Sequence, residues 1–319
     1  MVPANVRDQV SLGYLFARAA DTIADTDLID RHRRLDFLNQ FRTQFATGQI
    51  QWEQLRAIQV AVGPLQKDSA ERVLLERLED CFRLFEDFPA DDRQRIQRLM
   101  TTLTQGMEMD LTVFPGESAN NLTALKTMDD LDRYTYFVAG CVGEFWTDLM
   151  CAHRPALAGW NVADMSRAGV RFGKGLQLTN IVKDLAHDLQ RGRCYVPEPL
   201  LQEASLKPSD LLDPKNLSRF RPVLRKLLRI AVEHLDQGWG YTMAIPRYET
   251  RLRLSCMWPI LSAGESLRLV MTSPDLLNPA VKVKIPRLTV YQIMALTALT
   301  GACGYVGTAY WGRLRKQIA

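Results

Sequence analysis

Apolar residues recur at a helical spacing along almost the whole chain, and no stretch shows the alternating pattern of a half-buried strand. Helices are expected to stop at Phe88-Pro89, in residues 114–118 and at residues 195–197, where proline and glycine interrupt the pattern. No repeat or flexible linker divides the chain, so a single all-α domain over residues 1–319 is predicted. The predicted helices cover residues 8–26, 30–47, 68–87, 91–113, 128–153, 161–191, 217–244, 250–271 and 288–311.

A stripe of four polar residues runs along the first predicted helix. Tyr14, Arg18, Asp21 and Asp25 lie at offsets of 0, 4, 7 and 11 residues, which places them on one narrow face. The remaining positions of this helix are apolar or small all round, whereas a solvent-facing stripe normally lies opposite a single apolar face. The stripe is therefore predicted to face an internal cavity.

A second polar stripe lies on the helix predicted over residues 161–191. Its members, at offsets of 0, 3, 7 and 11, are Gln177, Asn180, Asp184 and Asp188. Leucine, isoleucine and valine cover much of the rest of this helix. For this stripe alone, a cavity wall and the polar face of an amphipathic surface helix are equally open interpretations.

The two aspartate pairs together predict a metal site. Carboxylates four residues apart on a helix point the same way and repel, and placing such a pair in a cavity is costly. Magnesium relieves the repulsion, because it binds one or two carboxylates and completes its octahedron with water and phosphate oxygens. We therefore expect Mg²⁺ and a substrate diphosphate between the pairs, with cationic contacts from Arg18, Lys183 and Arg193.

Residues 134–144 form a segment of small residues inside a predicted helix. Gly140 and Gly143 cost helix stability relative to alanine, so something is expected to approach the backbone closely there. Close helix packing and a bound hydrocarbon chain are equally open explanations. In the second, Tyr134 would project towards the reaction centre, and the apolar contacts would come from Val138, Ala139, Val142 and Gly143.

The composition narrows the class of protein. Hydrophobic residues make up 47% and charged residues 24%, as in ordinary globular proteins. The net charge of +4 is only mildly basic, and no face combines cations with aromatics, so nucleic acid is not an expected partner. The six cysteines form no CxxC pair and no Cys/His cluster, and the start has no signal peptide, so we expect reduced thiols in the cytoplasm.

The end of the chain leaves a membrane association open. Residues 290–311 are mostly apolar, close to the roughly 20 residues that a spanning helix needs. A last core helix over residues 288–311 is favoured, although the cations that follow would suit a membrane surface: Arg313, Arg315 and Lys316. A short basic cluster precedes this helix and is either a solvated turn or a contact to a phosphate group: Lys282, Lys284 and Arg287.

On these motifs the chain resembles the squalene/phytoene synthase family, the head-to-head branch of the isoprenoid synthases. The resemblance runs along nearly the whole chain and is anchored in residues 14–25, 134–143 and 175–188. The end of the last motif, residues 191–197, also matches. The members that form squalene, above all the bacterial ones, are the most similar, because residues 173–175, residues 194–197 and the basic cluster look more like theirs.

The resemblance implies a single all-α domain, an isoprenoid synthase fold of antiparallel helices around a central cavity. It implies a reaction that joins two C15 or C20 allylic diphosphates, farnesyl or geranylgeranyl diphosphate, through a cyclopropyl intermediate. A monomer is expected. Tyr134 matches an acid/base or cation-orienting tyrosine, and Tyr14, Arg18 and Arg193 match residues that contact diphosphate. Gln177 would lie beside the metal-site residues, which are Asp21, Asp25, Asn180, Asp184 and Asp188.

Two departures from the family pattern affect what is expected. A Ser-rich, Phe-containing segment that helps to hold diphosphate in the family has no counterpart here, because the chain begins only twenty residues before Asp21. Lys183 stands where arginine is usual, which keeps the charge but loses the bidentate contact.

Several activities remain open within and beside the family. The leading expectation is squalene formation with NADPH held through Lys284 and Arg287, and the alternative is phytoene or dehydrosqualene formation without a reductant. A head-to-tail prenyltransferase is disfavoured because its aspartates are adjacent (DDxxD). A non-catalytic family member is disfavoured because both aspartate pairs are present.

Overall fold

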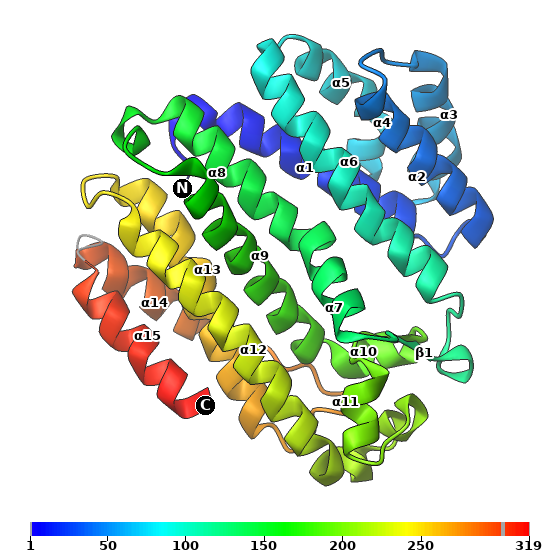
Figure 1. Cartoon of the computed structure of the whole chain (residues 1–319). Coiled ribbons are helices and arrows are strands. Elements are labelled where there is room, and N and C mark those ends of the chain that lie inside the picture. Colours follow the sequence, from blue (N-terminus) through cyan, green and yellow to red (C-terminus); the bar gives the residue numbers. More distant parts are fainter. Residues whose placement is uncertain (1, 301–303, 319) are drawn as a thin grey trace.

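Helices make up most of the computed structural model, which describes residues 2–300 and 304–318, and the all-α prediction is confirmed (Figure 1). The first half of the chain forms α1 (Arg7–Asp25), α2 (Arg31–Ala46), α3 (Trp52–Val62), α4 (Ser69–Glu76), α5 (Leu78–Glu86), α6 (Ala90–Val113), α7 (Met128–Thr135) and α8 (Cys141–His153). The second half forms α9 (Val162–Lys183), α10 (Leu185–Gln190), α11 (Glu198–Glu203), α12 (Leu217–Ala244), α13 (Thr250–Thr272), α14 (Arg287–Leu299) and α15 (Tyr305–Ile318).

Most boundaries agree with the predicted ones within a few residues, but some predictions were wrong. The helix predicted over residues 68–87 divides at Arg77 into α4 and α5, and the one over residues 161–191 divides at Asp184 into α9 and α10. Helices α3 and α11 had not been predicted. They have 11 and 6 residues, too few turns to show a clear helical period.

Two apolar clusters lie on either side of a central set of helices, in which α6, α8, α9 and α12 run side by side (Figure 1). The first cluster fills the space between α1, α2, α5 and α6 and is rich in aromatic rings. Phe16, at its centre, contacts Phe82 with ring centroids 4.7 Å apart and Phe45 at 5.0 Å. The second cluster joins α9, α12 and α13, and Phe172 on α9 packs against both clusters.

Close backbone contact joins α8 to α9 and explains the small residues between positions 134 and 144. A Cβ atom on Gly143 would lie 2.0 Å from the carbonyl oxygen of Gly169. A Cβ atom on Gly173 would likewise lie 2.1 Å from the carbonyl oxygen of Ala139. Helix packing, one of the two open explanations of the segment, therefore accounts for the glycine at position 143.

A π-helical turn, Tyr136–Gly140, joins α7 to α8. The residue that such a turn inserts changes the direction of the side chains before it relative to those after it, and π turns are frequent at functional sites. Tyr134 lies just before this turn and points at α6, since its hydroxyl donates to a carboxylate of Asp110 on that helix, 3.1 Å away.

Two short parallel strands, β1 (Thr123–Ala124) and β2 (Arg193–Cys194), fix the chain beyond the second aspartate pair. The Thr123 amide donates to the Gly192 carbonyl at 3.0 Å, and the Leu125 amide donates to the Cys194 carbonyl at 3.1 Å. Gly192 has φ +77°, a conformation that favours glycine, and it turns the chain from α10 into β2. Arg193 is thereby held on a paired backbone.

The prediction of one apolar helix over residues 288–311 was wrong. The structure has two helices there, α14 and α15, and both pack on α13. Among the described residues, no helix combines the length and the apolar character needed to cross a bilayer. The outward side of α14 is nevertheless apolar, with Leu288 66%, Tyr291 64% and Leu299 87% exposed.

A buried carboxylate ties α1, α6 and α8 together. Asp92 on α6 is 1% exposed and accepts hydrogen bonds from Gln9 (2.9 Å), Arg95 (3.0 Å) and the His153 ring (2.8 Å). Burial favours the protonated acid, but the hydrogen bonds from His153 and Gln9 outweigh this effect and hold the pKa of Asp92 below its ordinary value. The charged form is therefore the one that the fold stabilises.

We expect Asp92→Asn to lower the free energy of unfolding by about 3 kcal/mol at pH 7, because the buried partners lose a charged acceptor. The depressed pKa means that the contribution of Asp92 is present above the pKa of the unfolded chain and is lost as the pH falls through the folded value. Urea denaturation at pH 7 measures the loss. The control is Asp80→Asn, an exposed ion-pair partner of Arg77, which should change stability by under about 1 kcal/mol. Equal effects of the two substitutions would contradict the role of Asp92.

Candidate active site

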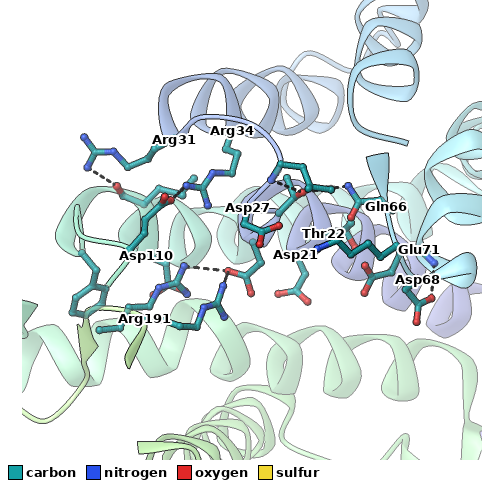
Figure 2. A pocket seen from close by; sticks show the side chains of 18 of the residues that line it. Asp21, Thr22, Asp27, Arg31, Arg34, Gln66, Asp68, Glu71, Asp110 and Arg191 are labelled. Atoms are coloured by element: carbon teal, nitrogen blue, oxygen red, sulfur yellow. Dashed lines mark hydrogen bonds and ion pairs between the residues drawn. The ribbon is translucent and has the colours of Figure 1, made fainter. Parts of the chain in front are cut away.

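A pocket of about 640 Å³ lies where the end of α1 meets α2, α6 and the segment after α10 (Figure 2). Three of the residues predicted to form the site from α1 line it, namely Arg18, Asp21 and Asp25. Arg193, from β2, lines it as well, so the structure brings the first aspartate motif together with the end of the second. Unpredicted residues also line it, and they include Arg31, Arg34, Glu71, Asp110, Glu117 and Arg191.

The first aspartate pair is held by cations in this structure. Arg18 contacts Asp21 at 2.5 Å and also pairs with Glu71 of α4. Burial has the largest effect and raises the pKa of Asp21; the neighbouring Asp25 carboxylate raises it further, and this second effect is the mutual repulsion expected from the sequence. Asp25 is paired with Arg193 at 3.2 Å and with Arg191 at 3.6 Å.

A buried hydrogen-bond network connects Arg193 to the predicted reaction-centre tyrosine. The carboxylate of Asp110 accepts from the hydroxyl of Tyr134 at 3.1 Å and from that of Tyr195 at 2.8 Å, and Arg193 lies 3.7 Å from it. The two tyrosine rings are stacked, with centroids 4.7 Å apart. Burial raises the pKa of Asp110 to about 6 despite the opposing effect of Arg193.

The ionisation of the remaining network members follows from the same burial. Burial and the Asp110 carboxylate raise the pKa of both Tyr134 and Tyr195 well above the ordinary value, so both phenols are neutral donors. Burial lowers the pKa of Arg193, but Asp110, Tyr195 and Asp25 raise it more, and the guanidinium stays charged. The network thus holds one fixed cation between two carboxylates.

The second aspartate pair lies next to this network. Burial and then Asp184 raise the pKa of Asp188 to about 7, with a further contribution from Asp110 and an opposing one from Arg193. Asp184 is more exposed and contacts Lys183 at 3.2 Å, while Lys183 also donates to the Asn180 side chain at 3.2 Å. The positive charge of Arg193 therefore acts on Asp188 as well as on Asp25.

Within the described residues, no group of three or more His, Cys, Asp or Glu side chains is arranged to hold a metal ion on its own. Each aspartate pair offers two carboxylates, which is the number that Mg²⁺ takes when phosphate and water complete its shell. Burial, and then the second carboxylate of each pair, raise the pKa values of Asp21 and Asp188, so an additional cation at either pair would be stabilised there. The donor types therefore fit a hard divalent ion shared with a phosphate ligand.

Several predicted residues lie outside this arrangement. Tyr14 is 67% exposed and is not among the residues that line the pocket, and Gln177 is half-buried on α9. Lys284 and Arg287 are exposed and also lie outside the pocket lining. The apolar residues of the small-residue segment divide: Ala139 and Gly143 contact α9, Val138 packs on Gly106 of α6, and Val142 is 39% exposed.

Asp110, Tyr195 and Arg34 were missed from the sequence. A signal for Asp110 did exist, because Leu99, Leu103, Gly106 and Asp110 have the offsets 0, 4, 7 and 11 and so share the apolar face of α6. A carboxylate on such a face needs a partner. No local pattern marked Arg34, whose burial depends on the meeting of α1, α2 and the loop after α6.

Comparison with known proteins was consistent with this site. The family model described as squalene/phytoene synthase matches residues 1–289. Squalene synthase ERG9 of Saccharomyces cerevisiae is 25% identical over 314 residues, 98% of this chain and 66% of that protein. A 15-cis-phytoene synthase of Enterobacter agglomerans is 37% identical over 146 residues, 46% of this chain and 44% of that protein. The chain thus spans 66% of the length of the yeast relative.

Solved structures show the same fold. The complex of TcSQS with the ligand BPH1237 superimposes with a TM-score of 0.79 at 21% identity, covering 99% of this chain and 84% of the other. The squalene synthase HpnC from Alicyclobacillus acidocaldarius gives a TM-score of 0.54 at 17% identity, covering 94% of this chain and 86% of the other. With the family model matching residues 1–289, the chain belongs to the squalene/phytoene synthase family.

Proposed function

We propose that this protein is a magnesium-dependent prenyltransferase that joins two farnesyl diphosphates head to head and, with NADPH, forms squalene. The observation that carries this proposal is the contact of the two aspartate motifs, in which Arg193 after the second pair meets Asp25 of the first at 3.2 Å. The comparisons favour squalene among the family products, because squalene synthases match 98% of the chain and phytoene synthases match shorter parts.

The alternative product is phytoene or dehydrosqualene, formed from geranylgeranyl or farnesyl diphosphate without a reductant. Its support is the higher identity of 37% to a phytoene synthase over 146 residues, and a fold likeness to a dehydrosqualene synthase with a TM-score of 0.59. A non-catalytic role has no such support, because both aspartate pairs are present and their carboxylates repel within each pair.

In this proposal Asp21 and Asp25 hold one part of the metal site, and Asp184 and Asp188, with Asn180 beside them, hold the other. Bound magnesium would neutralise the negative charge on the departing diphosphate, which lowers the barrier to breaking the allylic C–O bond.

Arg18, Lys183 and Arg193 would bind diphosphate oxygens, with Gln177 and Tyr14 at the edge of the site. Lys284 and Arg287 would contact the phosphate groups of NADPH. The apolar side chains Val138 and Val142 would keep water away from the allylic cation.

In this proposal Tyr134 orients the allylic cation, and Asp110 positions Tyr134. Asp110 accepts the Tyr134 proton in a hydrogen bond, so the lone pairs of the phenol oxygen point away from α6. Those lone pairs would orient and stabilise the allylic cation. Asp110 acts as a positioning residue, because it touches Tyr134, Tyr195 and Arg193 rather than the reacting atoms.

We further propose that α14 rests on the surface of an anionic bilayer on the cytoplasmic side. The outward row of Leu288, Tyr291 and Leu299 is apolar, and no carboxylate follows Asp275 in the sequence, although six cations do. A helix with one apolar face and neighbouring cations binds in the plane of such a surface. Contact with lipid would give the hydrocarbon product a direct exit.

The choice of product is tested by incubating the purified protein and Mg²⁺ with farnesyl or geranylgeranyl diphosphate, with and without NADPH, and extracting the hydrocarbons. We expect squalene from farnesyl diphosphate only with NADPH, and presqualene diphosphate without it. Asp184→Ala should lower turnover by roughly 100-fold or more, because a metal ligand is lost, while leaving the circular dichroism melting curve unchanged. Hydrocarbon formed equally well without NADPH would refute squalene, and full activity of Asp184→Ala would refute the metal role.

We expect Asp110→Asn to raise the stability of the protein and to lower its turnover. A pKa of about 6 in place of the ordinary 3.8 means that the folded state holds this proton more tightly than the unfolded state. Its contribution is therefore fully present below pH 3.8 and is lost, by roughly 3 kcal/mol, as the pH rises through about 6. Between pH 4 and pH 7, urea denaturation should show Asp110→Asn gaining stability relative to the natural protein, while turnover falls.

The matched control for Asp110 is Asp36→Asn, which removes an exposed carboxylate of α2. It should leave both the pH dependence and the turnover unchanged. A pH dependence of stability that is the same in Asp110→Asn as in the natural protein would show that this carboxyl group does not titrate near pH 6.

The bilayer contact is tested by sedimentation of the protein with vesicles of phosphatidylcholine alone or mixed with phosphatidylglycerol. We expect binding to the anionic vesicles, and a severalfold smaller bound fraction for the double variant Tyr291→Ser/Leu299→Ser, because apolar area is lost from the contact. Val60→Ser on α3, an equally exposed apolar residue (77%), is the control and should bind normally. Equal binding of all three proteins would show that α14 is not the contact.

A further inference from the structure

Positively and negatively charged side chains gather at opposite ends of the pocket (Figure 2). At one end, around Asp25 and Asp110, four guanidinium groups gather: Arg31, Arg34, Arg191 and Arg193. At the other end Arg18 and Lys67 are outnumbered by carboxylates, namely Asp21, Asp27, Asp68 and Glu71. The mechanism proposed above uses the carboxylate pairs and Arg193, and it leaves Arg34 without a role.

Arg34 is an unusual member of the arginine-rich end because it is buried. Its side chain is 4% exposed, and one terminal nitrogen donates to the carbonyl of Ala24, in the last turn of α1, at 3.1 Å. Its Nε finds no acceptor within the described part of the chain. Burial lowers the pKa of Arg34, and so does the positive charge of Arg193. A buried cation among other cations is stable only when an anion offsets its charge.

The anion that pairs with Arg34 in this structure is Glu117, and it is poorly suited to stay. Glu117 is 62% exposed and lies on the loop after α6, so its carboxylate keeps most of its contact with water. An ion-pair partner that is mostly solvated contributes little and is readily replaced. The backbone of the loop is closely packed beside it, since a Cβ atom on Gly116 would lie 2.2 Å from the Asn121 carbonyl oxygen. Only the side chain needs to move to free Arg34.

We propose that Arg34, with Arg31 and Arg191, forms a diphosphate-binding site at this end of the pocket, and that the Glu117 carboxylate occupies it when no diphosphate is bound. This inference rests on the proposed function, in which two prenyl diphosphates enter and two inorganic diphosphates leave. A diphosphate carries more charge than one carboxylate and presents several oxygens to planar guanidinium groups, so it displaces Glu117. Glu117 is thus an internal competitor for the ligand.

The experiment is isothermal titration of inorganic pyrophosphate into the whole chain in the presence of EDTA, which removes the metal-dependent contribution. Glu117→Gln should bind pyrophosphate roughly 3- to 5-fold more tightly, because the competing charge is gone. Arg34→Gln should bind it roughly 10- to 100-fold more weakly, because a charged hydrogen-bond donor is lost. Arg34→Lys should fall between Arg34→Gln and the natural protein. The control is Glu53→Gln, an exposed glutamate on α3, which should bind like the natural protein.

Steady-state kinetics distinguish the two sources of diphosphate. If the site holds the second substrate, Glu117→Gln lowers KM for the prenyl diphosphate; if it holds the released product, it lowers only the inhibition constant of pyrophosphate. Should Arg34→Gln fail to fold, as its circular dichroism would show, the Glu117→Gln titration decides alone. Affinity in Glu117→Gln equal to that of the Glu53→Gln control overturns the proposal. Because the titration needs neither prenyl chain nor metal, its result stands whether or not the protein makes squalene.

Discussion

The contact of Arg193 with Asp25 and Asp110 is the interaction on which the rest of the site depends. It joins three parts of the chain, the end of α1, the end of α6 and the strand after α10, around one guanidinium group that is 11% exposed. Without that cation, the carboxylate of Asp110, which is 14% exposed, and the more exposed carboxylate of Asp25 would face each other with no positive charge between them. The strand pairing at Gly192 and Cys194 holds the backbone of Arg193 in place, so the smallest element of secondary structure fixes the centre of the pocket.

Features of the fold and the site that depend on neighbouring residues could be predicted from the sequence, whereas those that depend on contacts between distant residues could not. Asp21 and Asp25 lie on one face of α1, so they could be found by their offsets within one helix. The same spacing also marked Asp184 and Asp188, although Asp184 ends α9 and Asp188 lies on α10. The division of the long helix at Asp184 and the interruption between α14 and α15 leave no trace in the apolar period. A period reports which side of a helix is buried, not whether its hydrogen bonds continue.

The small-residue segment shows the limit of reading chemistry from composition. Gly143 and Gly169 are 26 positions apart, and each fills the place where a side chain of the other helix would stand. The sequence therefore marks a close approach without saying whether a helix or a ligand makes it. Asp110 presents the opposite case, since its place on an apolar face was visible, but its partners Tyr134 and Tyr195 come from 24 and 85 residues away. Spacing could mark the need for a partner and not its identity.

The charges of the site also couple metal and diphosphate binding in the proposed mechanism. In the structure Arg18 is paired with Asp21, Lys183 with Asp184, and Arg191 and Arg193 with Asp25. Each of these cations is one that a diphosphate needs, and each carboxylate is one that magnesium needs. A metal ion that takes the carboxylates releases the cations, and a diphosphate that takes the cations releases the carboxylates, so each ligand removes the competitor of the other. Such reciprocal coupling is required of any two ligands that shift one common equilibrium. In the proposed mechanism, the ion pairs of the pocket are therefore also the reason why magnesium and diphosphate would bind together.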